Sequence, residues 1–510
     1  MTSASAASPA RPAARVVALG LILPLAAGAS SVFAFAPFYA WPVEILALAV
    51  LFAVWSAAGS ARQAWLSGYA FGLGCFLAGV SWIFVSLYEF GAMPAILAAI
   101  ATFAFCAYLA LFPAFAGWIA ARLGAASPAR RIALAAPSFV ALEWLRGTLF
   151  TGFPWLGVGT SQAPASPLAG FAPWLGAYGV SLAVCAAASL LAALALARGR
   201  ARVRFPLAIA LAVLFLAGGL ARLPEWTGPA GAPVRIALLQ GNVAQEIKWL
   251  EERRTRTLLE YRRMILAAPA RVVIVPETAL PAFLDQLPPD YMQGILAQAR
   301  SSGKDILLGT VERIVRDGSY DYYNSLVRIT GDPRESYRKR HLVPFGEFVP
   351  PGFAWALHIL HIPMSDFSRG TSTQAPLEAG GVRFGVAICY EDMFGEELID
   401  QLPAAQVLVN VSDDTWFGHS LEPEQHLQAS QMRALETGRW MVRATNTGVT
   451  AAVDERGRVV SRLPGFTQGT LLADVVPRNG MTPYARTGNL PTLAIVAAGL
   501  FVLRRRRVGD

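Results

Sequence analysis

The sequence has few charged residues, few histidines and few cysteines for its length. Only 15% of its 510 residues are Asp, Glu, Lys or Arg, while 55% are hydrophobic, which excludes an ordinary soluble protein. Nearly all of the acidic residues and all five histidines lie between about Arg222 and Asn489. We therefore expect the nearly uncharged remainder to cross a membrane.

Long apolar runs occupy this remainder, and most of them are close to the ~20 residues that a helix needs to cross a bilayer. The expected spans are roughly 16–36, 38–58, 64–87, 92–121, 132–150, 178–197 and 205–221, with a shorter eighth at 490–503. The first run could be mistaken for a secretory signal, but further apolar runs follow it instead of a globular chain. The sequence predicts a helical bundle of about eight spans.

Arginine distribution predicts the orientation of this bundle. Arginines cluster at 11–15, 62, 122–131, 198–204 and 504–507, which all fall on one side of the membrane if the spans alternate. By the positive-inside rule that side is cytoplasmic, and the large polar segment lies outside the cytoplasm. The formal charge of +9 then reflects orientation signals and contact with anionic lipid, so no nucleic-acid partner is expected.

The polar segment alternates strand-like and helix-like stretches. Strands are predicted at 234–239, 272–275, 306–310, 325–329, 382–388, 407–411, 441–444 and 471–476, and helices at 246–268, 290–301 and 423–437. The predicted organisation is a tail at 1–14, seven helices at 15–222, an α/β domain at 233–476, and an eighth helix with a basic tail at 487–510. Periodicity alone permits many α/β folds.

Cysteine is scarce, and its placement is informative. Cys389 is the single cysteine of the α/β segment and follows an apolar strand-like run at 386–388; the other three lie within predicted spans, at Cys75, Cys106 and Cys185. A disulfide inside the α/β segment is excluded, which favours a functional thiol. For the three others a small apolar role is expected.

A cysteine nucleophile needs a base or a positive charge nearby, and the sequence offers both. Glu277 follows the apolar run at 272–275, and Lys339 flanks another apolar run. A carboxylate can accept the thiol proton, and an ammonium can stabilise the oxyanion of a tetrahedral intermediate. His341 is the rival base, although a structural role is expected for it. The histidines lack tight ligand spacing, so no metal is expected.

Several motifs resemble those of the nitrilase superfamily, and especially those of its membrane-bound branch, the apolipoprotein N-acyltransferase family. The motifs are Gln240-Gly-Asn242, Lys248-Trp249, Pro276-Glu277, Lys339 to Glu347, Cys389-Tyr-Glu391 and Asn410 to Gly418. The resemblance covers nearly the whole chain. It implies a multi-pass helical bundle that carries an inserted nitrilase-like domain, an αββα sandwich, with Glu277, Lys339 and Cys389 as the catalytic triad.

The resemblance also implies supporting residues, each of which has a simpler structural alternative. Glu347 would hold Lys339 or shuttle a proton, whereas Glu347 and Glu391 could instead bind backbone groups in tight turns. Tyr390 and Glu391 would line the pocket, with the Tyr390 backbone N–H as a candidate oxyanion donor. Trp249 would contact substrate, or be a core aromatic.

The implied reaction moves a fatty acyl group from a phospholipid, expected to be phosphatidylethanolamine, through a Cys389 thioester to the N-terminal S-diacylglyceryl cysteine of an apolipoprotein. This is the last step of lipoprotein maturation, expected in the bacterial inner membrane on the periplasmic side, by a monomer without cofactor. The alternatives are a membrane-anchored nitrilase-type amidase and a non-catalytic lipoprotein-binding or transport component.

For two features the sequence leaves alternative roles open. Glu143 and Arg146 lie in the fifth predicted span, three residues apart on one helix face. They either tether a loop near the interface or contact a head group or the α/β domain. Residues 350–370 are apolar and proline-containing, and would be a buried connection or, as we expect, a lid that dips toward lipid.

Overall fold

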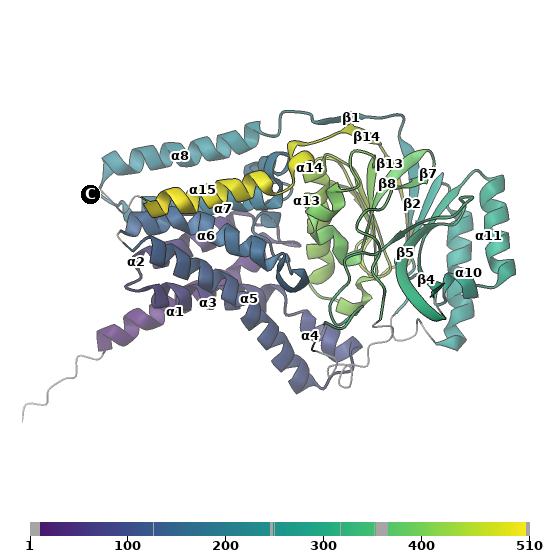
Figure 1. Cartoon of the computed structure of the whole chain (residues 1–510), viewed down its shortest axis with the longest axis horizontal. Helices are drawn as coiled ribbons and strands as arrows, with labels where there is room; N and C mark the ends of the chain where they lie inside the picture. The colour runs from purple at the N-terminus through teal and green to yellow at the C-terminus, as the bar shows by residue number, and fades with distance from the viewer. Residues whose placement is uncertain are drawn as a thin grey trace, which may run out of the picture.

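The computed structural model describes residues 11–125, 127–244, 248, 250–316, 318–350, 352 and 366–505. The chain forms a helical part and an α/β part that lie next to each other (Figure 1). The first and last helices both belong to the helical part, and α15 returns from the α/β part to pack against α6 and α7. The α/β part is thus an insertion between helices.

A helix lies at each of the eight apolar runs. The longer helices are α1 Arg11–Ser30, α2 Pro42–Ala57, α3 Ala61–Gly79, α5 Ala95–Leu123, α6 Pro128–Arg146, α7 Ala172–Leu196, α8 Ala201–Leu220 and α15 Leu490–Arg505. Short turns connect them: η1 Ser31–Ala34, α4 Ile83–Val85, η2 Ser86–Phe90, η3 Leu149–Thr151, η4 Thr160–Gln162 and η5 Pro167–Phe171. Serine side chains begin two of these helices, because Ser60 and Ser127 accept bonds from the N–H groups of Gln63 and Arg130.

Length and composition support fewer spans than the sequence predicts. Among the described residues, α5, α8 and the helix that ends at Leu196 are long and apolar enough to cross a membrane. A fourth span results if α3 and the segment Ile83–Phe90, bent by 58°, are counted as one. The apolar stretches Gly20–Ala34, Pro42–Ala57 and Leu490–Arg504 are shorter. Helix α6 carries four charged residues, Arg130, Arg131, Glu143 and Arg146.

Small residues allow the helices α1, α3 and α5 to pack closely. A Cβ on Gly28 of α1 would overlap the carbonyl of Phe71 on α3, and a Cβ on Gly68 of α3 would overlap the carbonyl of Pro113 on α5. Backbone contact of this kind is typical of helices that associate within a membrane, where apolar burial alone gives little driving force.

The α/β part contains two six-stranded sheets. One has the order β12-β11-β10-β9-β8-β7 and the other β13-β2-β3-β4-β5-β6. Their strands are β2 Val234–Gln240, β3 Val272–Val275, β4 Asp305–Arg316, β5 Ser319–Arg328, β6 Glu335–Arg338, β7 Leu377–Ala379, β8 Val382–Ile388, β9 Val407–Ser412, β10 Met441–Thr445, β11 Ala451–Val453, β12 Val459–Arg462 and β13 Gly469–Val475. The strands β2, β3 and β4 are mutually parallel, as are β8, β9 and β10.

Helices cover the outer faces of both sheets. They are α10 Glu251–Ala267 and α11 Pro289–Ser301 on one side, and α12 Gly395–Ile399 and α13 Glu422–Thr437 on the other. The short turns η8 Cys389–Met393 and η9 Asp414–Phe417 follow β8 and β9, η6 Leu284–Gln286 precedes α11, and α14 Pro483–Thr487 precedes α15. Alternation along β2 shows the layering: Ile236 and Leu238 pack between the sheets, whereas Ala237 and Leu239 pack under α10 and α11. The four layers are therefore α, β, β and α.

Helix α13 joins the two parts of the molecule. Leu427 and Ala434 pack on the strands, while Met432 and Leu435 belong to the core of the helical bundle. The chain enters and leaves the α/β part through one short antiparallel pair, β1 Thr227–Pro229 with β14 Arg478–Gly480. Both connections hold the α/β part in a fixed place beside the bundle.

All eight predicted strands are present, and the differences are at their ends. The hairpin of β4 and β5 extends well beyond 306–310 and 325–329, because the ladder continues as far as the Arg316 and Ser319 pair, through residues without a buried apolar run. Six short strands, β1, β6, β7, β11, β12 and β14, were not predicted, since three or four residues carry too little periodicity to be recognised. Helix α10 begins at Glu251, and residues 245–247 and 249 lie outside the described part.

Candidate functional site

Cys389 lies directly after β8, at the carboxyl end of a parallel strand. Its φ of 53° is in the left-handed region, which costs a non-glycine residue roughly 1–3 kcal/mol and therefore needs support. Two side chains supply it, because the Cys389 carbonyl accepts bonds from Asn410 Nδ2 at 2.9 Å and from His426 Nε2 at 3.2 Å. The backbone that presents the thiol is thus fixed in a sharp turn.

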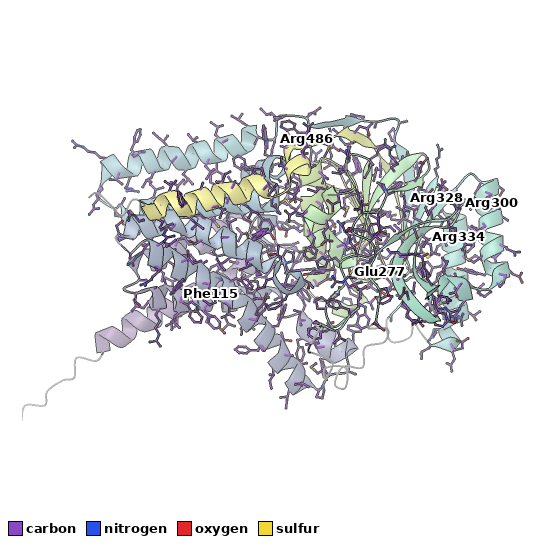
Figure 2. The ribbon with its side chains drawn as sticks, in the orientation of Figure 1. Phe115, Glu277, Arg300, Arg328, Arg334 and Arg486 are labelled. Atoms are coloured by element: carbon purple, nitrogen blue, oxygen red, sulfur yellow. The ribbon has the colours of Figure 1, made fainter. Side chains whose placement is uncertain are left out.

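Glu277 and Lys339 lie beside this turn, each just beyond a strand of the other sheet. Glu277 follows β3 and Lys339 follows β6, and Lys339 Nζ is 3.5 Å from Glu277 Oε1. Glu277 is labelled within the α/β part, away from the helical part that contains Phe115 (Figure 2). Both side chains are almost completely buried, and their charges act on the Cys389 thiol. The structure brings the three sequence-predicted residues together.

Glu347 and Asn324 complete the polar cluster. Glu347 Oε1 accepts a bond from Lys339 Nζ at 2.9 Å, and Asn324 Nδ2 donates to Glu277 at 2.6 Å and to Glu347 at 2.9 Å. The second oxygen of Glu277 accepts the backbone N–H of Asp413 at 2.8 Å. Both carboxylates are therefore oriented, and one ammonium lies between them.

Burial determines the protonation of these groups. Burial raises the pKa of Glu277, and Lys339 only partly opposes it. Burial also raises the pKa of the Cys389 thiol well above its usual value; Glu277 adds to the effect and Lys339 opposes it. Lys339 stays protonated, since Glu347 and Glu277 overcome its burial and raise its pKa. At rest the site holds a neutral thiol beside a carboxylate that is more basic than usual.

Glu391 connects the lysine segment to the cysteine turn. Its Oε1 accepts the backbone N–H groups of Arg340 and His341, at 2.7 and 3.1 Å, and its Oε2 accepts that of Ile388 at 2.8 Å. Burial raises the pKa of Glu391 to about 6. This geometry matches the structural alternative, in which Glu391 binds backbone groups.

The remaining sequence candidates have different positions. His341 Nδ1 lies 2.8 Å from Glu397, and its ring stacks on Phe394 with centroids 3.7 Å apart. Its ring also approaches that of Tyr390, with centroids 5.8 Å apart. Trp249 and most of the 350–370 segment lie outside the described residues.

A buried ionic cluster behind the cysteine was not assigned a role from the sequence. Arg443, fully buried, binds Asp414 at 2.9 Å and His426 Nδ1 at 2.7 Å, and His426 Nε2 lies 2.8 Å from Asp392. His426 Nε2 faces two acceptors, the Asp392 carboxylate and the Cys389 carbonyl, so it carries a proton. Asp414, Glu422 and His426 could in principle hold a metal, but the guanidinium already binds two of them.

A second buried pair supports Glu277 from another direction. Lys248 Nζ is 2.5 Å from Asp413 and also donates to Thr278 at 3.0 Å. The backbone N–H of Asp413 donates to Glu277, and Thr278 directly follows Glu277 in the chain. Lys248 and Asp413 both lie in motifs that resemble those of the family, Lys248-Trp249 and Asn410 to Gly418. These motifs could have identified the two residues, whereas strand periodicity does not distinguish them.

A cavity lies at the seam between the two parts. It has a volume of about 640 Å³ and is lined by residues that include Tyr178, His341, Phe394 and Tyr484. None of its lining residues belongs to the triad, so it is separate from the thiol.

Comparison with known proteins agrees with the geometry. The family model described as "Apolipoprotein N-acyltransferase N-terminal domain" matches residues 27–190, and "Carbon-nitrogen hydrolase" matches residues 235–484. Proteins named "Apolipoprotein N-acyltransferase" from Nitrosomonas europaea and Methylococcus capsulatus are 48% and 46% identical, over 95% and 96% of this chain and 96% of each relative. One from Ralstonia nicotianae is 43% identical over 95% of this chain and 94% of the relative. The chain therefore belongs to the apolipoprotein N-acyltransferase family.

Proposed function

We propose that the protein transfers a fatty acyl group from a phospholipid, with phosphatidylethanolamine as the expected donor, to the α-amino group of the N-terminal S-diacylglyceryl cysteine of apolipoproteins. The observation that carries the proposal is the burial of Glu277 and Lys339 beside the strained Cys389 turn, in a chain that matches the family over nearly its full length.

The first step forms a thioester. Glu277 accepts the Cys389 proton while the sulfur attacks the ester carbonyl of the phospholipid. The oxyanion is stabilised by the Lys339 ammonium and by the Tyr390 backbone N–H. The ester C–O bond then breaks, and lysophospholipid leaves with the proton that Glu277 returns.

The second step transfers the acyl group. The lipoprotein amine attacks the thioester carbonyl, Glu277 accepts a proton from the nitrogen, and the C–S bond breaks to regenerate the Cys389 thiol. A buried site favours the amine over water as the second nucleophile, which gives amide in place of free fatty acid. Glu277 returns its proton to the sulfur, so neither step requires a cofactor.

The helical part fits substrates that live in a membrane. Ile209, Val213 and Leu216 on α8 are 46%, 55% and 62% exposed, an apolar surface that lipid would cover. We propose eight spans, with both termini in the cytoplasm and the α/β part on the periplasmic side of the inner membrane, from the arginine distribution. The protein would act as a monomer.

One assay tests the function directly. The purified protein is mixed with phospholipid labelled in its acyl chains and with a synthetic diacylated lipopeptide. Amide-linked label on the lipopeptide supports the proposal. Ammonia release from small amides without lipopeptide acylation would instead identify an amidase.

A further inference from the structure

The connection from α6 to η4, here called the 147–159 loop, has several unfavourable backbone torsion angles. Phe150, Thr151 and Leu156 have φ values of 54°, 77° and 52°, in the left-handed region that non-glycine residues rarely adopt. A loop in this state needs contacts from outside to hold it.

Two buried charged residues of α6 supply those contacts. Arg146 Nη1 donates to the carbonyls of Phe153 at 2.7 Å and Trp155 at 2.6 Å, and Glu143 Oε1 accepts the N–H of Val158 at 2.6 Å. Glu143 and Arg146 are 4% and 5% exposed, so water does not compete for these bonds. Both side chains therefore form hydrogen bonds to the backbone of the loop.

The loop in turn contacts the residue that follows the nucleophile. The Tyr390 hydroxyl donates to the Gly152 carbonyl at 3.1 Å, and the ring of Tyr390 lies nearly parallel to that of Trp155, with centroids 6.3 Å apart and 12° between planes. Phe153 approaches Tyr390 at 6.4 Å. The side chain of Tyr390 is thus packed by the helical part, while its backbone belongs to the cysteine turn.

The same loop also reaches the support of the Cys389 carbonyl. Trp155 Nε1 donates to Gln425 Oε1 at 2.7 Å, and its ring lies 5.5 Å from the ring of His426. His426 is one of the two donors to the Cys389 carbonyl. Tyr390, which follows the nucleophile, and His426, which binds its carbonyl, therefore both contact Trp155.

We infer that Glu143 and Arg146 are positioning residues of the acyl-transfer reaction: they hold the 147–159 loop so that Tyr390 and His426 keep the Cys389 thiol and the Tyr390 backbone N–H in reactive geometry. The inference rests on the proposed function. It resolves the alternatives for the two residues in favour of a loop tether, and gives that tether a role in chemistry. The bundle then completes the nucleophile turn in addition to anchoring the domain.

The test compares two arginines that each donate to two carbonyls of one loop, Arg146 in a buried place and Arg222 in an exposed one. Arg146→Met removes both bonds to the 147–159 loop. Arg222→Met is the matched control, because Arg222 donates to the carbonyls of Pro164, at 2.7 Å, and Ser166 on another loop that does not contact Tyr390. Each variant is purified in detergent and measured for kcat and KM in the lipopeptide assay, and for the alkylation rate of Cys389 by iodoacetamide, localised by mass spectrometry.

Arg146→Met is expected to lower kcat by roughly 10- to 100-fold and leave KM for phospholipid within about twofold, since an error near 1 Å in the nucleophile is costly. The alkylation rate of Cys389 should change in the same variant. Arg222→Met should leave both rates at the wild-type level. Equal kcat values for Arg146→Met and Arg222→Met would overturn the inference.

A double-mutant cycle separates positioning from general destabilisation. Tyr390→Phe removes the bond to Gly152, and its effect on kcat should largely disappear in the Arg146→Met background, because the loop is already released. Additive losses would refute the coupling. If Arg146→Met does not fold, Arg146→Lys, which can keep one of the two bonds, enters the same cycle. The alkylation readout does not need acyl transfer, so it still decides the inference if the lipopeptide assay of the wild type is negative.

Discussion

The carboxylate of Glu347 lies 2.9 Å from the ammonium of Lys339, closer than Glu277 does at 3.5 Å. The lysine charge is therefore balanced mainly by a residue other than the proposed base. Glu277 is left with an incompletely compensated charge in a buried place, which is why its pKa is raised. The arrangement separates two tasks, since one acid holds the lysine and the other exchanges protons.

Replacing Glu347 by glutamine should move the acid limb of the pH–rate profile to lower pH. The negative charge of Glu347 raises the pKa of Glu277, and its loss also frees Lys339 to stabilise the Glu277 carboxylate. Both effects lower the pKa of Glu277, so it stays deprotonated at lower pH. The pH profile of Cys389 acylation measures this, and a limb that stays in place or moves upward contradicts the assigned roles.

Carboxylate and imidazole can be distinguished as the base. Glu277→Gln should lower turnover by ~10²-fold or more, because it removes the proton acceptor but keeps the side-chain size. His341→Asn should have a mild effect, since His341 binds Glu397 and stacks on Phe394. The opposite ranking of the two variants in the lipopeptide assay would favour a Cys-His site.

The buried ionic cluster around Arg443 should contribute more to the free energy of unfolding than an exposed ion pair does. Burial opposes ionisation of Asp414, but Arg443 and His426 overcome it and lower its pKa, so its contribution is present at neutral pH and is lost as pH falls through that low pKa. Arg443→Met leaves the buried Asp414 charged without its arginine partner, and should cost about 3–5 kcal/mol at neutral pH. The deficit should shrink in acid, where Asp414 becomes protonated.

Denaturant unfolding in detergent, followed over pH, measures this deficit. The control is Arg462→Met, which breaks an ion pair with Glu424 whose side chains are 41% and 23% exposed, and should cost no more than about 1 kcal/mol. Equal losses for the two arginines, or a deficit of Arg443→Met that grows in acid, would contradict the role given to the cluster.

Periodicity and strand-end polarity predicted the strands and the polar residues that follow them, because both patterns survive in a single chain. The layers and the catalytic triad were predicted from the resemblance of the motifs to a known family. It could not predict Asn324, which sits inside a strand where any polar residue looks like a surface position. Arg443 and His426 were missed for the same reason, since burial is a tertiary property. The function of Glu143 and Arg146 depends on a loop whose path no periodicity encodes. The count of eight spans also remains a prediction.

The proposed topology can be tested with introduced cysteines in a background where Cys389 is alanine and the remaining cysteines, Cys75, Cys106 and Cys185, are buried. Ser319, exposed at the tip of the β4–β5 hairpin, should be labelled as cysteine by an impermeant reagent in intact spheroplasts. Ala201, exposed at the start of α8 in a predicted cytoplasmic connection, should react only after permeabilisation. Protection of position 319 in intact spheroplasts would reject the orientation.

The acyl-enzyme is the most direct prediction of the mechanism. A thiol that attacks an ester must pass through a thioester, and with phospholipid present but no amine acceptor that species should accumulate. The protein should gain one fatty acyl group on the peptide that contains Cys389, lose it to neutral hydroxylamine, and lose it again when diacylated lipopeptide is added.

Two variants make this experiment selective. Cys389→Ala should show neither the mass gain nor product, whereas Cys389→Ser should acylate slowly and transfer poorly, because an oxygen ester is less reactive toward amines than a thioester. His341→Asn serves as a matched control that should still accumulate the thioester. Efficient lipopeptide acylation by Cys389→Ala, or wild-type product formation without a detectable thioester, would instead favour direct transfer in a ternary complex, and Glu277 would then have to activate the amine itself.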